Sequence, residues 1–298
     1  MIIGTAHQPE FGLGDPRKVT TVNVASVPQR SVFRYPGGKT WLIPRIREWL
    51  TSLPKKPKLL VEPFAGGGIV SLTAAFEGLV EKVLLVEMDD EVAAVWQTIV
   101  DGRAEWLAKR IEDFNMSLET AKEIVFSSPT STDEIAFRTI VKNRTYHGGI
   151  LADGSTFLKH GESGKGVRSR WYAATLARRL RDIDSIRDRI DFVHGDAFEI
   201  MKQYGNKKTT VWFVDPPYTA GGKSAGSRLY THSKVDHERV FSMMEKVQGD
   251  SLLTYDIADE VKILAEKYHF QSKLVPMKNT HHAEMTELLI GRNLSWLP

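Results

Sequence analysis

Cysteine is absent from this sequence of 298 residues. Its absence excludes disulfide bonds, thiolate metal sites and cysteine nucleophiles. No apolar run approaches the roughly 20 residues that a membrane-spanning helix needs. The amino terminus also lacks the basic segment and following apolar segment of a signal peptide. The sequence therefore predicts a soluble, cytoplasmic protein with no membrane partner.

A metal-ligand pattern is also missing from the sequence. His281 and His282 are adjacent, but no third histidine or carboxylate stands at ligand spacing from them. We therefore predict no metal site.

Positive charge is concentrated in one segment of a chain whose net charge is only +3. Between residues 138 and 181, ten Lys/Arg stand against Asp153 and Glu162, so the segment carries +8 and the rest of the chain −5. Such a concentration is typical of a surface that binds a polyanion. An ordinary solvated basic face explains it equally well, so the pattern alone leaves both interpretations open.

Short apolar segments alternate with helical ones early in the sequence. A short strand that breaks into a glycine turn is expected at 58–68, and a second strand that ends in acids is expected at 82–91. A helix follows each of them, and another helix is expected at 41–53. This alternation predicts a doubly wound α/β fold, in which helices cover both faces of a Rossmann-like sheet.

The alternation lapses between residues 102 and 188, where the sequence is helical or loop-like. Strand patterns return at 190–198, 209–218 and 250–256, and the last two, 270–278 and 286–293, predict an antiparallel hairpin. We therefore predict three parts: an irregular arm at 1–30, a sheet domain from 31–101 and 189–298, and an inserted, mostly helical region at 102–188.

A glycine turn, EPFAGGG, follows the first expected strand. Gly66 and Gly68 fit the start of the dinucleotide fingerprint, although Ser71 stands where its third glycine would be. Glu87 ends the next strand, 19 residues after Gly68, which is the spacing of acids that bind ribose hydroxyls. Together these residues favour an adenosine-bearing cofactor over a simple tight turn.

Two further motifs flank this core. FRYPGGK, residues 33–39, combines two glycines, the flat ring of Tyr35 and the cation Lys39 before a helix, although an ordinary loop has the same composition. Near residue 215 the apolar run VWFV is followed by Asp-Pro-Pro-Tyr. This tetrapeptide is either a stiff end to a strand or a set of functional groups placed at the strand's carboxyl end.

In this order, FRYPGGK, EPFAGGG, an acid-ended strand and DPPY resemble the Dam-like family of DNA adenine N6-methyltransferases. The resemblance runs from Ser31 to Arg292. It implies a site-specific enzyme that transfers a methyl group from S-adenosylmethionine to adenine in double-stranded DNA, with base flipping, as in restriction-modification. The family's target-recognition region lies between the cofactor half and DPPY, where the basic insertion lies here.

The resemblance also implies which residues hold the cofactor. Glu87 would bind the ribose hydroxyls, Asp196 would lie near the adenine ring, and the FRYPGGK motif would lie around the methionine end. The full set is Tyr35, Gly37, Gly38, Lys39, Glu62, Pro63, Phe64, Ala65, Gly66, Gly68, Glu87, Met88, Asp196, Ala197 and Asp215.

The DPPY motif is then expected to be catalytic. Its residues are Asp215, Pro216, Pro217 and Tyr218. The lone pair of an exocyclic adenine amine is delocalised into the ring. The Asp215 carboxylate and the Pro216 carbonyl can accept both of its hydrogens, at a spacing that the prolines fix. Tyr218 offers a face on which an extruded base can stack.

The basic insertion supplies the expected DNA contacts, and its NRTYHGG segment resembles part of the family's recognition region. The candidates are Arg144, Tyr146, Lys159, Lys165, Arg168 and Arg170. Methylation of N4-cytosine or of RNA adenine uses similar tetrapeptides, and a non-catalytic DNA-binding protein is an alternative from another class. The aspartate of DPPY and the order of the motifs favour adenine in DNA.

Overall fold

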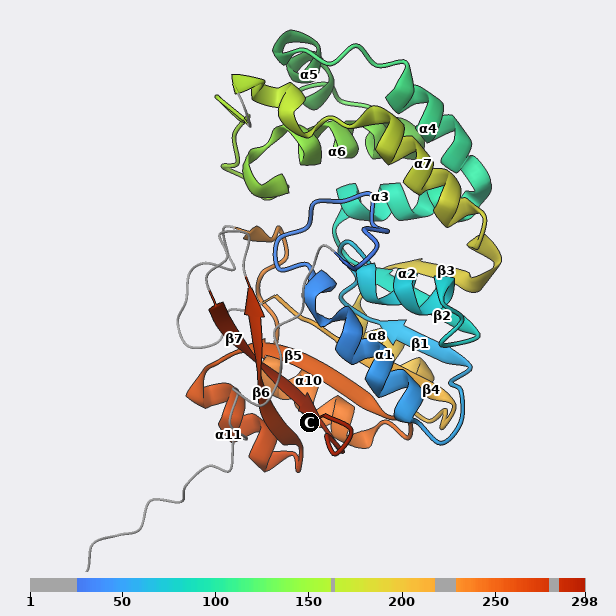
Figure 1. Cartoon of the computed structure of the whole chain (residues 1–298), viewed down its shortest axis with the longest axis vertical. Helices are drawn as coiled ribbons and strands as arrows, with labels where there is room; N and C mark the ends of the chain where they lie inside the picture. The colour runs from blue at the N-terminus through green and yellow to red at the C-terminus, as the bar shows by residue number, and fades with distance from the viewer. Residues whose placement is uncertain (1–25, 162–163, 218–228, 279–283, 298) are drawn as a thin grey trace, which may run out of the picture.

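The computed structural model describes residues 26–161, 164–217, 229–278 and 284–297. In Figure 1 a sheet with flanking helices forms the lower part of the molecule, and a group of helices forms the upper part. The upper helices are α4 (Ala104–Glu112), α5 (Leu118–Val125), α6 (Thr132–Thr145) and α7 (Ala173–Asp184). Most of the predicted arm at 1–30 lies outside the described residues.

The described part of the sheet has seven strands in the order β3-β2-β1-β4-β5-β7-β6. The parallel strands are β1 (Leu59–Glu62), β2 (Lys82–Glu87), β3 (Ile190–His194), β4 (Thr210–Val214) and β5 (Ser251–Asp256). The antiparallel pair is β6 (Gln271–Lys278) and β7 (Glu284–Gly291). The predicted α/β sheet and carboxyl-terminal hairpin are confirmed. The second strand of the hairpin, β7, joins the sheet beside β5 and leaves β6 at the edge.

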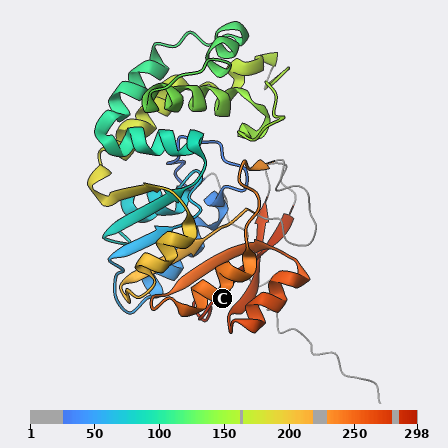
Figure 2. The same ribbon diagram turned by 180° about the vertical axis from the view of Figure 1, so that it is seen from behind.

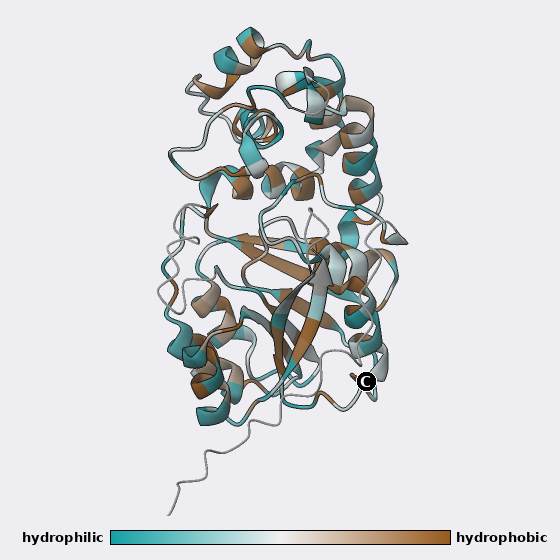
Figure 3. Cartoon of the chain, turned by 60° about the vertical axis from the view of Figure 1, so that its left-hand side comes forward, coloured by the Kyte–Doolittle hydropathy of each residue, from teal (hydrophilic) through white to brown (hydrophobic). Residues whose placement is uncertain are grey.

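Helices cover both faces of the sheet, as its parallel strands require. One face carries α1 (Ile43–Ser52), α2 (Ile69–Phe76) and α3 (Asp90–Thr98), and the other, turned forward in Figure 2, carries α8 (Ala197–Tyr204), α10 (His237–Lys246) and α11 (Asp259–Lys267). Because side chains alternate along a strand, Phe213 of β4 packs in the first core while Trp212 packs in the second. Figure 3 shows this pattern as hydrophobic central strands between helices of mixed hydropathy.

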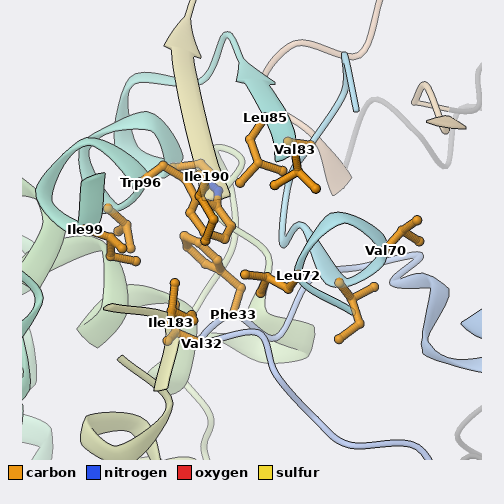
Figure 4. Packing of buried hydrophobic residues seen from close by; sticks show 14 of the residues in the cluster. Val32, Phe33, Val70, Leu72, Val83, Leu85, Trp96, Ile99, Ile183 and Ile190 are labelled. Atoms are coloured by element: carbon orange, nitrogen blue, oxygen red, sulfur yellow. The ribbon is translucent and has the colours of Figure 1, made fainter. Parts of the chain in front are cut away.

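The core on the first face continues into the upper helices. Figure 4 shows Val83 and Leu85 of β2 in one cluster with Trp96 of α3. Ile183 of α7 and Phe33, which precedes α1 in the chain, belong to the same cluster. The upper helices thus pack on the sheet through one continuous apolar core.

Short helical turns complete the described elements: η3 (Lys39–Leu42), η4 (Ile99–Arg103), η5 (His147–Gly149), η7 (Gly166–Arg170) and η8 (Arg187–Arg189). No helix among the described residues is long and apolar enough to span a bilayer. Pro216 and Pro217 follow β4, and because neither can donate a backbone hydrogen bond, they end the strand at the edge where the loops gather.

Candidate active site

A cavity of about 1480 Å³ opens where the carboxyl ends of β1, β2 and β4 meet the upper helices. All of the predicted cofactor residues line it, as do Asp215 and Pro217. Pro216 is buried, and Tyr218 lies outside the described residues. The position matches the rule that open α/β sheets bind ligands at the carboxyl ends of their strands.

The glycine turn needs its glycines for both shape and space. Gly66 and Gly68 have φ angles of +47° and +61°, in the left-handed region that side chains rarely adopt. A Cβ at Gly66 would lie 2.5 Å from the Tyr35 ring, and one at Gly68 would lie 2.9 Å from the ring of Trp96. The Trp96 indole N–H also donates to the Gly66 carbonyl at 2.9 Å. Two aromatic rings thus hold the turn in place.

Glu87 braces the same turn. Its Oε2 accepts from the Gly66 N–H at 2.9 Å, and its Oε1 accepts from the backbone of Met88 and Asp89 at 2.8 and 3.0 Å. Burial raises the pKa of Glu87, although these N–H groups oppose the rise. The next acid, Asp196, caps α8 by accepting from the Phe198 N–H at 2.7 Å.

Asp215 follows β4 directly, and neighbours hold both of its carboxylate oxygens. The Lys39 ammonium lies 2.9 Å from Oδ2, and the Thr254 hydroxyl donates to Oδ1 at 2.7 Å. Lys39 also donates to the Gly37 carbonyl at 2.8 Å and lies 3.7 Å from Glu287 Oε2. Burial alone would lower the pKa of Lys39, but Asp215 and then Glu287 raise it above its ordinary value. Lys39 therefore remains a cation beside Asp215.

Two buried acids lie around this ion pair. Burial raises the pKa of Glu62 to about 8, although it accepts from the Ser71 N–H at 3.0 Å. Ser71, which replaces the third glycine of the fingerprint, thus helps to hold Glu62. Burial also raises the pKa of Glu287 to about 7 against the attraction of Lys39. Both carboxyl groups can carry a proton near neutral pH.

Four arginines gather where the cavity meets the upper helices: Arg34, Arg144, Arg170 and Arg179. Arg144 is 5 % exposed and donates to the Val32 carbonyl, and Arg179 donates to the Ser31 carbonyl at 2.9 Å. Burial, and then repulsion by the other three arginines, lowers the pKa of Arg144 to about 9. Neither Arg144 nor Arg179 has a carboxylate partner in the described part of the chain.

The other predicted DNA contacts lie away from the cavity. Lys159, Lys165 and Arg168 are exposed, and Arg168 donates to the Met116 carbonyl at 2.7 Å. Tyr146 is only 7 % exposed because its ring packs edge-on against that of Phe157, 4.8 Å away.

Part of the positive charge counted in the sequence is neutralised within the protein. Arg138 and Lys142 pair with Glu91, at 3.2 and 2.7 Å. Arg181 pairs with Glu105 and Glu112, both at 2.8 Å.

Besides Arg34 and Arg179, sequence reasoning missed Thr254, Glu287 and Tyr230. Tyr230 donates to the Pro36 carbonyl at 3.0 Å, and its ring centroid lies 5.9 Å from that of Tyr35. Glu287 had a detectable signal, since it is an acid within the apolar strand sequence TELLIG. Thr254 and Tyr230 had none, because their importance depends on which strand or loop lies beside Asp215 and Tyr35.

Comparisons with known proteins agree with this geometry. The family described as D12 class N6 adenine-specific DNA methyltransferase matches residues 35–275. The Type II methyltransferase M.MjaIII of Methanocaldococcus jannaschii is 23 % identical over 216 residues, which cover 66 % of this chain and 72 % of that protein.

Solved structures of methyltransferases are similar to the chain at lower identity. The rRNA methyltransferase aviRa from Streptomyces viridochromogenes has a TM-score of 0.44 and 13 % identity, covering 91 % of this chain and 93 % of its own. An rRNA methylase from Streptococcus thermophilus has a TM-score of 0.40 and 10 % identity, covering 85 % of this chain and 97 % of its own.

The family match spans most of the chain and confirms the resemblance read from the motifs, including the reaction and the cofactor. The chain belongs to the D12 class of N6 adenine-specific DNA methyltransferases, which use S-adenosylmethionine.

Proposed function

We propose that this enzyme methylates an adenine extruded from duplex DNA, and that Asp215 and the Pro216 carbonyl accept the two hydrogens of its N6 amino group. The observation that carries the proposal is the place of Asp215. It lies at the carboxyl end of β4 in the same cavity as the glycine turn, with its carboxylate fixed on both oxygens.

The residues of the turn fit S-adenosylmethionine. Gly66 and Gly68 let the turn pack tightly at the edge of the cavity, since a side chain at either position would collide with Tyr35 or Trp96. Glu87 Oε2 accepts one hydrogen bond within the protein and so retains an acceptor position for a ribose hydroxyl. When bound, S-adenosylmethionine supplies an electrophilic methyl group on its sulfonium.

The protein's own task is to prepare and aim the amine. Accepting both N–H hydrogens draws the nitrogen toward tetrahedral geometry and makes its lone pair available for attack. Because the amine is paired within a duplex, the base must be extruded first. Tyr218 is proposed from the sequence as the stacking partner of the extruded base, worth roughly 1–3 kcal/mol. Alignment of the amine nitrogen, the methyl carbon and the sulfonium sulfur then provides most of the catalysis.

The cluster of arginines is proposed to bind the phosphates beside the extruded nucleotide. Arg144 and Arg179 are wholly or partly buried cations that face no carboxylate among the described residues, and an anion would offset their repulsion. Arg170 lines the same cavity, while Lys159, Lys165 and Arg168 would meet the DNA backbone farther out. The burial of Arg144 and Tyr146 assigns them to shaping this surface more than to reading bases.

The proposal is tested by incubating the purified protein with unmethylated plasmid and S-adenosylmethionine, followed by digestion to nucleosides and mass spectrometry. We expect N6-methyldeoxyadenosine with wild type and a loss of at least about 1000-fold with Asp215→Ala, while calorimetry still detects cofactor binding. Sequencing the methylated plasmid gives the recognition site. Matched single-stranded and duplex oligonucleotides then test the preference for duplex, and 2-aminopurine at the target reports extrusion. Methylation at the wild-type rate by the Asp215→Ala variant would overturn the proposed role of Asp215.

A further inference from the structure

The carboxylate of Asp215 is held by side chains that no sequence motif marks as catalytic. Thr254 lies on β5, the strand next to β4, and Glu287 lies on β7, where it pairs in register with Asp256. Lys39 comes from the start of η3. Residues far apart in the sequence thus converge on one carboxylate.

These contacts come from buried side chains. Thr254 is fully buried, and the side chain of Lys39 is 2 % exposed, whereas that of Asp215 is 20 % exposed and lines the cavity. The hydroxyl and the ammonium are therefore almost inaccessible to solvent, whereas the carboxylate that they bind stays open to the cavity.

Such contacts decide the orientation of the carboxylate plane. The terminal torsion of an aspartate is broad, so the side chain alone does not fix its oxygens. A donor to Oδ1 and a cation at Oδ2 together select one plane. The Lys39 ammonium is itself bonded to the Gly37 carbonyl and attracted by Glu287, so these two residues help to position Asp215 through Lys39.

We propose that Thr254, Lys39 and Glu287 are positioning residues that fix the plane of the Asp215 carboxylate for the incoming amine. This rests on the proposed role of Asp215. Thr254 makes the most specific contribution, because its hydroxyl bonds the catalytic carboxylate directly. Glu287 acts through Lys39 and has a smaller effect.

The test uses the full chain, plasmid DNA carrying the mapped recognition site, and tritiated S-adenosylmethionine. Thr254→Val keeps the side-chain shape and removes the hydroxyl, while Thr254→Ser keeps the hydroxyl. We expect kcat to fall about tenfold or more in the valine variant, because small misplacements of a catalytic group are costly. KM for DNA and the Kd for cofactor should stay within about twofold, and the serine variant should recover most of the rate. Glu287→Gln should lower kcat by about threefold.

Thr210→Val is the matched control, since Thr210 is also buried in the sheet but lies at the opposite end of β4. It should leave kcat unchanged. A wild-type kcat for Thr254→Val beside an inactive Asp215→Ala would overturn the positioning role and leave the proposed function intact. A valine variant that loses cofactor affinity while keeping kcat would also overturn it. An active Asp215→Ala would instead overturn the proposed function itself.

Discussion

The carboxyl edge of the sheet and the outer surface of the inserted helices use the same charged residue types in opposite ways. At the edge, Lys39 is buried, bonded to Asp215 and attracted by Glu287. On the outer surface, Arg181 is exposed and chelated by Glu105 and Glu112. Buried pairs are costly to disrupt and fix geometry, whereas exposed pairs contribute little to stability. The comparison shows that the count of charges in a segment does not reveal their function, because their partners decide it.

The largest expected effect comes from removing the buried cation, Lys39. Lys39→Met leaves the partly exposed Asp215 and the buried Glu287 without their cation, so we expect a loss of up to about 3–5 kcal/mol in the free energy of unfolding, measured by urea denaturation. Arg181→Met is the exposed counterpart and should change the unfolding curve much less. Equal effects of the two substitutions would contradict the distinction.

The second prediction concerns Glu62, whose pKa of about 8 lies above that of an unfolded glutamate. Between about pH 4.5 and 8 the folded protein retains a proton that the unfolded chain has released, so stability falls as the pH rises through this range. Glu62→Gln keeps an acceptor for the Ser71 N–H and removes this titration.

Urea denaturation at pH 5 and pH 8 measures this effect. Between pH 5 and pH 8, the free energy of unfolding of the variant should rise relative to that of wild type by on the order of 3 kcal/mol. Glu199→Gln is the control, since Glu199 is an exposed acid paired with Lys202. A difference between Glu62→Gln and wild type that does not change with pH would refute the prediction.

The third prediction compares two arginines on the same helix. Among the residues that the structure describes, Arg179 at the cavity has only a carbonyl partner, whereas Arg181 is held by two acids. Arg179→Gln should weaken DNA binding about tenfold and reduce the slope of log affinity against log salt by about one. Arg181→Gln should change neither quantity in fluorescence anisotropy titrations. Matching salt slopes for the two variants would remove Arg179 from the proposed phosphate site.

The smallest effect concerns two tryptophans. Trp96→Phe removes the hydrogen bond to the Gly66 carbonyl, so we expect cofactor affinity to fall about threefold to tenfold, measured by calorimetry. Trp212 is equally buried, but its indole N–H has no hydrogen-bond partner in the described structure, and it packs on the other face of the sheet. Trp212→Phe should therefore leave cofactor affinity unchanged. A similar loss in both variants would show a general packing effect.

The sequence predicted the parts of the fold that depend on local patterns. The apolar runs predicted the strands, and the glycine turn and DPPY were expected at strand ends, where the structure brings the turn, Asp215 and Pro217 into one cavity. It did not predict that β7 lies between β5 and β6, because an antiparallel hairpin can join a sheet through either strand. Thr254 was missed for the same reason, since its contact with Asp215 depends on strand order.

Partners also decide between the two interpretations that the charge pattern left open for each residue. Ten basic residues between 138 and 181 indicated a polyanion surface, but Arg138, Lys142 and Arg181 are paired with acids from α3 and α4. Arg34, which lies outside that segment, joins Arg144, Arg170 and Arg179 at the cavity. Spacing along the chain gave no sign of either fact, because both depend on tertiary contacts.

The most direct test of the central claim is a crystal structure of the enzyme with duplex DNA carrying its recognition site and S-adenosylhomocysteine. We predict an extruded adenine whose N6 nitrogen lies within about 3.2 Å of both an Asp215 carboxylate oxygen and the Pro216 carbonyl. Thr254 and Lys39 should keep their contacts with Asp215 in that complex. An adenine bound with its N6 nitrogen away from Asp215 would contradict the account.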